Sequence, residues 1–424
     1  MTRTLDSRRE WVGVLSAALL GLVLTVYVIA GIELSKRAFT VDFIQFFASA
    51  RSLAAGDSPY TPLRLADFNP AEAESLAAAA APHPNLNPPV LSLLLAPVGF
   101  LGLRASYLWW TGYSLISGLL ACALVWRGLH GAGQNALGLV WLWLVFLIYF
   151  PTYKALTMGQ VTMVTLLPLV GAWFAARSGN ERLAGTLLGV AVSLKVFIAL
   201  VAVFFAIQRR WRIVAWAIGT VLFVVVVTLP FVSVGAYVEY FSVVGSVTWF
   251  GNSWNASYAA AVTRVLGGSE NVPLVNLPKV ARGLVLVCSG ATLLWLAWLT
   301  WPRPGGGCDT RRFDLGYGLT LTVMLLVSPL GWMYYFPFLL LPGYAIWSLT
   351  RSGRLRVIRW GLVGAWGLST IPTSMVRATD VNDPLGWFTS NSVYFYALCL
   401  LAIVASRAVA SIDQRSDILS ATPS

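Results

Sequence analysis

An aspartate just beyond the first apolar run is the residue with the clearest chemical potential in this sequence. The run covers residues 11–34, is long enough to cross a bilayer and follows a basic N-terminus. Asp42 comes after it in the aromatic-rich segment 40–47. A carboxylate near the far membrane face can act as a base toward a hydroxyl group that reaches it along the membrane. The structural alternative for Asp42 is an ordinary turn residue after a helix.

A lysine stands in the middle of a second informative run, residues 183–207, which is apolar and basic at both ends. Because basic loops mark the cytoplasmic side, both ends favour the same side. We therefore expect two half-helices, one ending at Leu194 and one starting at Val196, with Lys195 at the apex. Ionisable groups at membrane depth usually face a cavity or a partner, and broken helices are tolerated where they line one. The alternative is one long tilted helix from which Lys195 snorkels.

Further polar and aromatic residues occur in segments that we place on the same outer side. They are Arg51, Gln160, Trp254, Asn255, Trp332, Tyr334 and Tyr335. With Asp42 and Lys195 they suit a sugar carried on a lipid phosphate. The carboxylate would take the proton of an attacking hydroxyl, the cation would stabilise the departing phosphate, and aromatics and amides would hold the sugar. Taken singly, an aromatic residue at a membrane interface more often belongs to an aromatic belt.

The composition is that of a membrane protein. Hydrophobic residues make up 58% and charged residues 11%, whereas a soluble domain has about 25% charged residues. The first apolar run is longer than a signal-peptide core, and no small-residue cleavage site follows it. The net charge of +12 comes from basic residues in short loops. This pattern indicates membrane orientation and attraction to lipid headgroups, and not a nucleic-acid partner.

The four cysteines and two histidines do not form a metal-binding pattern. The cysteines are far apart and mostly inside apolar runs, so we expect neither a disulfide nor a structural metal. Motifs for nucleotide or dinucleotide binding are absent, and no cofactor is indicated. The metal dependence of the chemistry stays open at this stage, because Asp42 has no carboxylate partner close in sequence.

These runs predict an all-α fold, a multi-pass transmembrane helix bundle with about ten crossings and both termini in the cytoplasm. The predicted crossings are residues 11–34, 106–126, 136–150, 160–176, 213–229, 283–301, 315–330, 335–349, 357–372 and 393–405. Residues 88–101 are too short to cross and predict a half-membrane or interfacial helix. An enlarged outer loop, 35–87, carries Asp42 and an Ala-rich helical stretch at 70–81. We expect one domain, 1–424, with a disordered tail over 408–424.

Several different short motifs follow one another along most of the chain. They are Val41-Asp42-Phe43, the Ala-Ala-Gly-Asp-Ser-Pro-Tyr segment 54–60, Asn87-Pro88-Pro89-Val90, Gly159-Gln160, Ser193-Leu194-Lys195 with the basic segment 208–212, residues 252–258, and Ser328-Pro329 with Trp332. Each motif is too short to be specific by itself, so the resemblance depends on their order along the chain. In this order they resemble glycosyltransferase family 87, which are integral-membrane enzymes of the GT-C fold.

The resemblance implies transfer of a sugar from a polyprenyl-phosphate donor to a glycolipid or a cell-envelope polysaccharide outside the cytoplasm. It assigns the family's loop-one aspartate to Asp42, as general base, and its mid-membrane lysine to Lys195, as a phosphate contact. We expect inversion, with mannose as the first choice of sugar and arabinofuranose as the second. Many mannosyltransferase members have a histidine after the Ser-Pro-x-x-Trp turn. Here Met333, Tyr334 and Tyr335 follow Trp332, and tyrosine does not titrate near neutral pH.

A lipid-linked-sugar flippase or another membrane transporter is the main alternative, because a lysine on a broken helix would serve it equally well. Such proteins often have two related halves, and we find no convincing internal repeat. The enlarged first outer loop also favours an enzyme. A non-catalytic membrane scaffold is a third interpretation, and replacement of Asp42 separates it from an enzyme, since a scaffold would be indifferent to that change.

Overall fold

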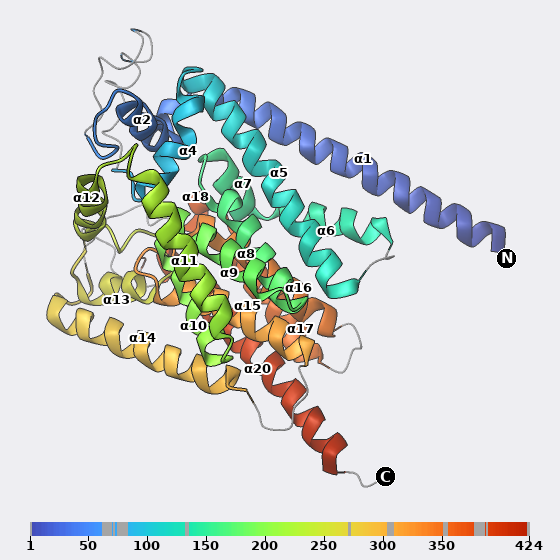
Figure 1. The fold of residues 1–424 in the computed structure, drawn as a ribbon. Helices are drawn as coiled ribbons and strands as arrows, with labels where there is room; N and C mark the ends of the chain where they lie inside the picture. The colour runs from blue at the N-terminus through green and yellow to red at the C-terminus, as the bar shows by residue number, and fades with distance from the viewer. Residues whose placement is uncertain are drawn as a thin grey trace. The chain divides into compact units, whose positions relative to one another are not determined.

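A computed structural model describes most of the chain. It covers residues 2–61, 70, 73, 84–131, 135–269, 273–302, 309–350, 355–376, 386 and 389–421, without the side chains of 2–9, 40 and 413–421. Every regular element in these ranges is helical, and the only β-type contact among them is an isolated bridge between Asn255 and Trp332 (Figure 1). The predicted all-α fold is therefore confirmed. The Ala-rich stretch 70–81 lies outside the described residues, apart from positions 70 and 73.

The chain divides into two compact units that are interleaved in sequence. Unit 1 comprises Met1–Leu167, Ser193–Lys195 and Leu222–Gly245. Unit 2 comprises Pro168–Val192, Val196–Val221 and Ser246–Ser424. Three helices contribute residues to both units: α8 (Thr162–Arg177), α9 (Glu181–Leu194) and α11 (Trp211–Thr228). The single domain that we expected from the sequence remains a prediction.

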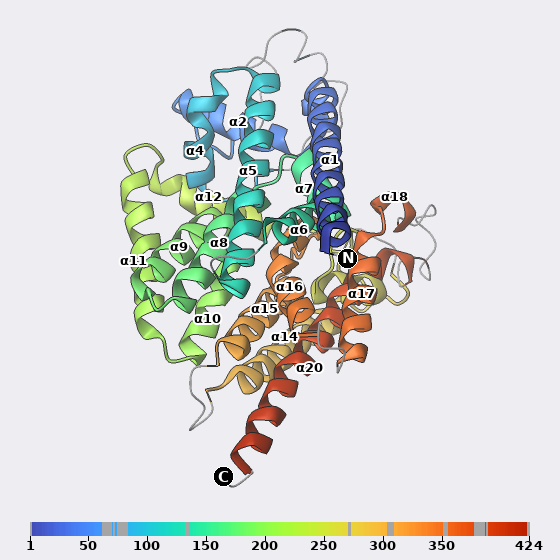
Figure 2. The same ribbon diagram turned by 90° about the vertical axis from the view of Figure 1, so that its right-hand side faces the viewer.

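The longest helices of unit 1 pack side by side. Helix α1 (Thr2–Ser35) lies against α5 (Leu103–His130) and α6 (Ala136–Ile148) in both views (Figures 1 and 2). Helix α7 (Phe150–Thr157) follows α6 after a bend of 67°. Many large apolar side chains of α1 are exposed, which is the expected state of a helix that faces lipid.

Shorter elements of unit 1 carry the candidate chemistry. The 3-10 helix η1 (Ala38–Thr40) leads into α2 (Phe43–Ala54), which packs against α4 (Pro89–Gly99) and α5. Helix α4 occupies the segment that we predicted to be a half-membrane or interfacial helix. Helix α12 (Val234–Gly245) also packs against α4. The prediction missed α2 and α12, because neither is long enough to stand out as an apolar run.

Unit 2 is built around helix α15 (Thr310–Val327), in which every position from Asp314 to Leu326 is buried. A helix buried on all sides needs neighbours all round. Its neighbours include α10 (Leu200–Ile207), α13 (Tyr258–Leu266), α14 (Pro278–Thr300), η4 (Met333–Leu339), α16 (Leu340–Leu349) and α20 (Val393–Ala421). Helix α17 (Arg356–Thr370) packs against α16 and α20, and the short elements α18 (Thr373–Val376) and η6 (Ser390–Ser392) follow it.

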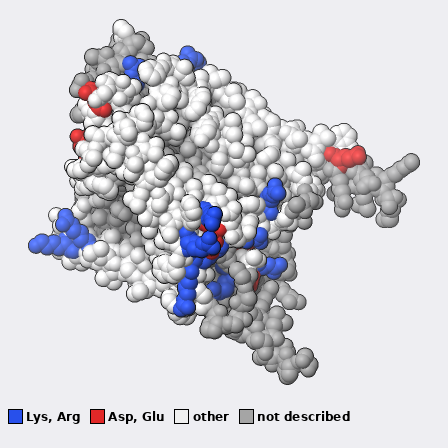
Figure 3. Space-filling model, in the orientation of Figure 1, with Lys and Arg blue, Asp and Glu red and all other residues white. Residues whose placement is uncertain are grey.

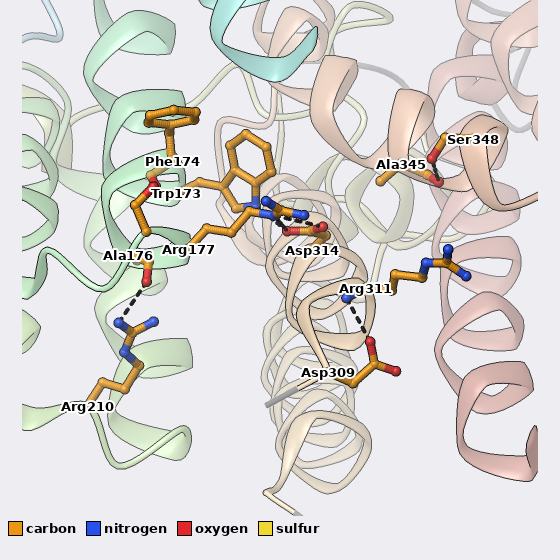
Figure 4. A network of polar contacts seen from close by, with 11 residues as sticks. Trp173, Phe174, Ala176, Arg177, Arg210, Asp309, Arg311, Asp314, Ala345 and Ser348 are labelled. Atoms are coloured by element: carbon orange, nitrogen blue, oxygen red, sulfur yellow. Dashed lines mark hydrogen bonds and ion pairs between the residues drawn. The ribbon is translucent and has the colours of Figure 1, made fainter. Parts of the chain in front are cut away.

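An ion pair between a half-buried arginine and a buried aspartate lies near the start of α15. The Trp173 indole and the Arg177 guanidinium, both on α8, point to the Asp314 carboxylate (Figure 4). The Trp173 Nε1 to Asp314 Oδ1 distance is 2.9 Å, and the Arg177 Nε to Oδ1 distance is 3.0 Å. A buried carboxylate needs such donors, because burial without them is costly. The contact therefore sets the register between α8 and α15 inside unit 2.

The run 183–207 is broken at Lys195, as predicted. Helix α9 ends at Leu194, the 3-10 helix η3 (Val196–Ala199) follows, and α10 completes the run. The two ends of this run lie close together in space. Arg210 Nε is 3.0 Å from Glu181 Oε1, and Arg210 Nη2 donates to the Ala176 carbonyl at 2.8 Å. The chain thus returns to its starting side, and a single long tilted helix is excluded.

Five described helical segments are long and apolar enough to cross a membrane, and a sixth is added if the bent pair α6–α7 is one span. They are Glu10–Ser35, Leu103–His130, Trp211–Thr228, Pro278–Thr300 and Ser390–Ile412. Little of the face drawn in Figure 3 carries charged side chains, which also suits a membrane protein. The ten crossings predicted from the sequence remain a prediction.

The C-terminal boundary differs from the prediction. Helix α20 continues to Ala421, well into residues 408–424, for which we expected disorder. Ala408 and Val409 are almost fully buried, and Ile412 is only 8% exposed. Apolar packing therefore extends beyond Ala405, and the tail becomes polar later than we assumed.

The glycine turn that ends α7 packs against the start of α2. Gly159 has φ +67°, its N–H bonds the Leu156 carbonyl, and the Gln160 N–H bonds the Ala155 carbonyl at 2.9 Å. This is a Schellman helix ending, which favours glycine at the left-handed position. A Cβ atom at 159 would lie 2.6 Å from Phe43 Cβ. The start of α2 therefore sits directly on this turn, and only glycine fits between them.

We predict that Gly159→Ala lowers the melting temperature of the purified protein far more than Gly179→Ala. Gly179 has φ +81° in the same kind of helix ending, with nothing within 4 Å of its would-be Cβ. Both changes cost about 1–2 kcal/mol of backbone strain. Only Gly159→Ala adds a clash, which typically costs about 1–3 kcal/mol more. Equal melting temperatures for the two variants in detergent would contradict the close packing of this turn on Phe43.

Candidate functional site

Asp42 is held by a side chain from the glycine turn. It occupies the N-cap position of α2, yet its carboxylate does not cap that helix. The Gln160 side-chain Nε2 instead donates to Asp42 Oδ2. The Phe43 N–H donates to the Met158 carbonyl at 3.1 Å, so a backbone hydrogen bond also links the start of α2 to the turn after α7. The positive end of the α2 dipole favours the ionised carboxylate at this position.

Lys195 is brought into the same unit by the break between α9 and η3. It is 9% exposed, and its Nζ donates to Asn87 Oδ1 at 2.8 Å and to the Leu86 carbonyl at 3.2 Å. It also lies within electrostatic range of Asp42, as does Lys154 on α7. Asp42, Gln160 and Lys195 therefore belong to the same structural unit.

A set of hydrogen-bonded side chains, here called the asparagine cluster, surrounds the Lys195 contact. It consists of Asn85 and Asn87 with Ser49, Ser92 and Tyr60. Asn87 Nδ2 donates to Asn85 Oδ1 at 2.9 Å, and Asn85 Nδ2 donates to Ser49 Oγ at 3.1 Å. The Tyr60 hydroxyl donates to the Asn87 carbonyl at 2.6 Å. Burial raises the pKa of Tyr60 well above its ordinary value, so the phenol remains a donor.

Arg51 lies at the other end of α2 from Asp42. The two positions are nine residues apart, which corresponds to about 13 Å of helix. The Arg51 guanidinium stands over the Phe47 ring, 5.8 Å from its centroid. Within the helix, therefore, Arg51 and Asp42 are not neighbours, although both belong to unit 1.

The remaining predicted site residues lie together in unit 2. The segments around Asn255 and Trp332 are joined by the isolated bridge, and the Met333 N–H donates to the Trp254 carbonyl at 2.7 Å. The Trp332 and Tyr334 rings stack at 5.9 Å, and Tyr334 and Tyr335 meet edge to face at 5.0 Å. From the sequence we expected these segments to converge with the loop that carries Asp42, and within unit 2 the two of them lie together.

Asn255 has a structural role in this pair of segments. It is fully buried, and its Nδ2 donates to the Phe250 and Pro329 carbonyls at 3.0 and 2.8 Å. Its Oδ1 accepts the Ser257 N–H. Both amide protons are therefore used by the protein itself, and Asn255 joins the two loops rather than presenting its amide to a ligand.

Arg264 on α13 supports the same loop and was not among the predicted site residues. It is fully buried and donates from Nε to the Gly251 carbonyl at 3.0 Å and from Nη1 to Ser392 Oγ at 2.9 Å. Nη2 donates to the Asn252 carbonyl at 3.0 Å and also to that of Asn255. Burial lowers the pKa of Arg264 to about 9, which leaves it a cation at neutral pH. No sequence signal distinguished it from an exposed loop arginine.

Among the described residues, no group of three or more His, Cys, Asp or Glu side chains is placed to hold a metal ion. The chemistry that the described side chains offer is acid–base and electrostatic. A carboxylate oriented by an amide donor can accept a proton, and a nearby ammonium can attract an anion. Asn85, Asn87, Tyr60 and Lys154 were not among the predicted site residues, although Asn87 and Tyr60 lie in two of the motifs that carry the resemblance. The Asn-x-Asn-Pro-Pro spacing was a local signal for the two asparagines, and it also marks an ordinary turn.

Comparison with known proteins gives consistent matches. The sequence model of glycosyltransferase family 87 matches residues 85–329, more than half of the chain. This range includes Asn87, Gln160 and Lys195 but begins after Asp42. A polyprenol-phosphate-mannose-dependent alpha-(1-2)-phosphatidylinositol pentamannoside mannosyltransferase of Mycolicibacterium smegmatis is 26% identical over 77% of this chain and 76% of its own. A protein of the same description from Mycobacterium tuberculosis is 25% identical over 76% and 72%.

Among solved structures, ArnT from Cupriavidus metallidurans in the apo state is similar over 91% of this chain and 77% of its own. The sequence identity is 14% and the TM-score is 0.37. The family match, in contrast, extends from Asn85 to the Ser-Pro turn at 328–329 and agrees with the order of motifs along the sequence. This chain is a membrane glycosyltransferase and belongs to glycosyltransferase family 87.

Proposed function

We propose that this glycosyltransferase moves mannose from a polyprenyl-phosphomannose donor to a hydroxyl group of a phosphatidylinositol-type glycolipid. Asp42 accepts the proton of the acceptor hydroxyl, and the hydroxyl oxygen forms a bond to the anomeric carbon. The bond from that carbon to the phosphate oxygen breaks, and polyprenyl phosphate leaves with the electron pair. A single displacement of this kind inverts the anomeric configuration.

The observation that carries the proposal is the association of a carboxylate and a buried ammonium in unit 1. Gln160 orients Asp42, and Asn87 holds Lys195 within electrostatic range of it. Negative charge grows on the phosphate as it departs, and a fixed cation stabilises that charge more in the transition state than in the ground state. Lys154 is a second cation in range of Asp42. The named activity of the two curated relatives supports the choice of mannose and of the acceptor.

The aromatic residues of unit 2 are assigned here to substrate binding as a separate part of the proposal. Trp254 is half-buried, whereas Trp332, Tyr334 and Tyr335 are at most 8% exposed, and the proposal gives them the role of an aromatic surface for the sugar. The stacking of Trp332 on Tyr334 supports a rigid binding surface. Variants of these residues would raise the KM for a substrate with less effect on kcat, if they provide uniform binding.

The donor is tested directly with the purified full-length protein. We expect radiolabel to move from polyprenyl-phosphomannose to an added phosphatidylinositol mannoside, and not from polyprenyl-phosphoarabinose. Transfer of only the arabinose label would replace mannose by arabinofuranose. Movement of the intact labelled lipid across a vesicle bilayer without any transfer would favour a flippase.

Asp42→Asn is predicted to lower kcat by about 10²–10⁴-fold, the usual contribution of a general base. The amide still occupies the same volume beside Gln160, so the melting temperature should stay close to that of the wild type. Asp57→Asn, a carboxylate change in the same loop, is the matched control and should retain activity. Full activity of Asp42→Asn would remove this aspartate from the mechanism.

We also propose that both termini are cytoplasmic and that the loop bearing Asp42 faces the outer side of the cell membrane. The clustering of basic residues in the opposite loops supports this orientation. Reporter enzymes that work only in the cytoplasm should be active when fused to either end. A thiol reagent that does not cross the membrane should label Asp57→Cys in intact cells, and protection of that cysteine would reverse the orientation.

A further inference from the structure

We propose that Asn87 is the positioning residue that holds the Lys195 ammonium ready for a lipid phosphate, and that Asn85 fixes the orientation of Asn87. This inference deepens the proposed function and rests on it for the identity of the ligand. Its own support is the hydrogen-bond geometry of the asparagine cluster.

The orientation of each amide follows from its partners. Asn85 Nδ2 faces the hydroxyl groups of Ser49 and Ser92, at 3.1 and 3.4 Å. Asn85 Oδ1 therefore faces the other way and accepts both the backbone N–H and the side-chain Nδ2 of Asn87, at 3.0 and 2.9 Å. With its Nδ2 used in this way, Asn87 presents Oδ1 to Lys195. The cluster thus selects the amide rotamer that can accept from an ammonium group.

Two of the oxygens that Lys195 contacts are neutral. They are the amide oxygen of Asn87 and the backbone carbonyl oxygen of Leu86. Neutral acceptors solvate an ammonium group without cancelling its charge, whereas a carboxylate in the same place would form an ion pair. These two contacts therefore do not neutralise the ammonium group, which can attract an incoming phosphate beside the Asp42 carboxylate. An asparagine at position 87 is therefore better suited to this task than an aspartate.

The rigidity of the cluster is provided by its surroundings. Asn85 is 5% exposed and Asn87 is 2% exposed. The Tyr60 hydroxyl donates to the Asn87 backbone carbonyl, and the Tyr60 ring lies 6.2 Å from that of Tyr240 on α12. The Pro88-Pro89 pair follows directly and restricts the backbone. The amide of Asn87 is thus fixed on both its side-chain and its main-chain side.

The test measures the affinity of the full-length protein in nanodiscs for polyprenyl phosphate, with uncharged polyprenol as a comparison ligand. Asn87→Leu removes the acceptor, and Asn87→Asp places a carboxylate on Lys195. Both should weaken phosphate binding by about tenfold or more, since hydrogen bonds to charged groups are the strong ones. Polyprenol binding should change less than twofold. Asn391→Leu, which replaces a buried asparagine of unit 2, is the control and should leave both affinities unchanged.

A double-mutant cycle separates positioning from a general structural effect. In a Lys195→Met background, Asn87→Leu should change phosphate affinity less than about twofold, because a residue that acts through Lys195 has nothing left to position. Additive losses in the double variant would overturn the inference. Unchanged phosphate affinity of Asn87→Leu, or equal losses for phosphate and polyprenol, would overturn it as well.

The outcome is distinguishable from a failure of the proposed function. If the wild-type protein binds polyprenyl phosphate with the predicted pattern of variants but transfers no mannose, the role of Asn87 stands and the assigned reaction falls. If mannose transfer is observed and Asn87→Leu transfers with wild-type kcat/KM for the donor, the assigned reaction stands and the role of Asn87 falls.

Discussion

A positive charge inside an apolar protein must be solvated by protein oxygens. Lys195 meets this requirement at a break between two helices, where the chain turns back and no regular helix continues. Its ammonium group is held by an amide oxygen and a carbonyl oxygen that come from a segment more than one hundred positions earlier. The cost of burying the charge is therefore offset only if the helix break and the Asn-x-Asn-Pro-Pro segment are both in place. The helix break at Lys195 and the segment 85–89 therefore stabilise each other.

The carboxylate depends on a second long-range junction. Asp42 starts a helix, but the side chain that orients it comes from the end of α7, and the glycine between them admits no side chain. The backbone of Phe43 bonds to that same helix ending. Carboxylate and ammonium are thus each fixed by a contact between a helix terminus and a remote loop. The candidate chemistry therefore lies at helix ends and loops, where the backbone is irregular.

Much of this arrangement could be predicted from the sequence because charge is rare in it. Asp42, Gln160 and Lys195 stand out against apolar surroundings, and basic residues at both ends of one run revealed the broken helix. Asn85 and Asn87 gave no such signal. Asparagine before proline is an ordinary turn signal, and the partner of Asn87 lies 108 positions away. Asn255 was recognised as part of a motif, but only its bonds to backbone carbonyls show that it joins two loops. Helices α2, α12 and α13 were missed because short amphipathic or interfacial segments lack a long apolar run.

The interleaving of the two units has a consequence for how this protein can be divided. Three consecutive residues, Ser193–Lys195, belong to unit 1 while the sequence on either side belongs to unit 2. No single cut in the chain yields one unit complete with its own residues. A gene fragment that ends at Leu167, for example, would lack two segments of unit 1, and one of these segments contains Lys195. Truncation or domain exchange at a single boundary therefore separates residues that belong to the same unit.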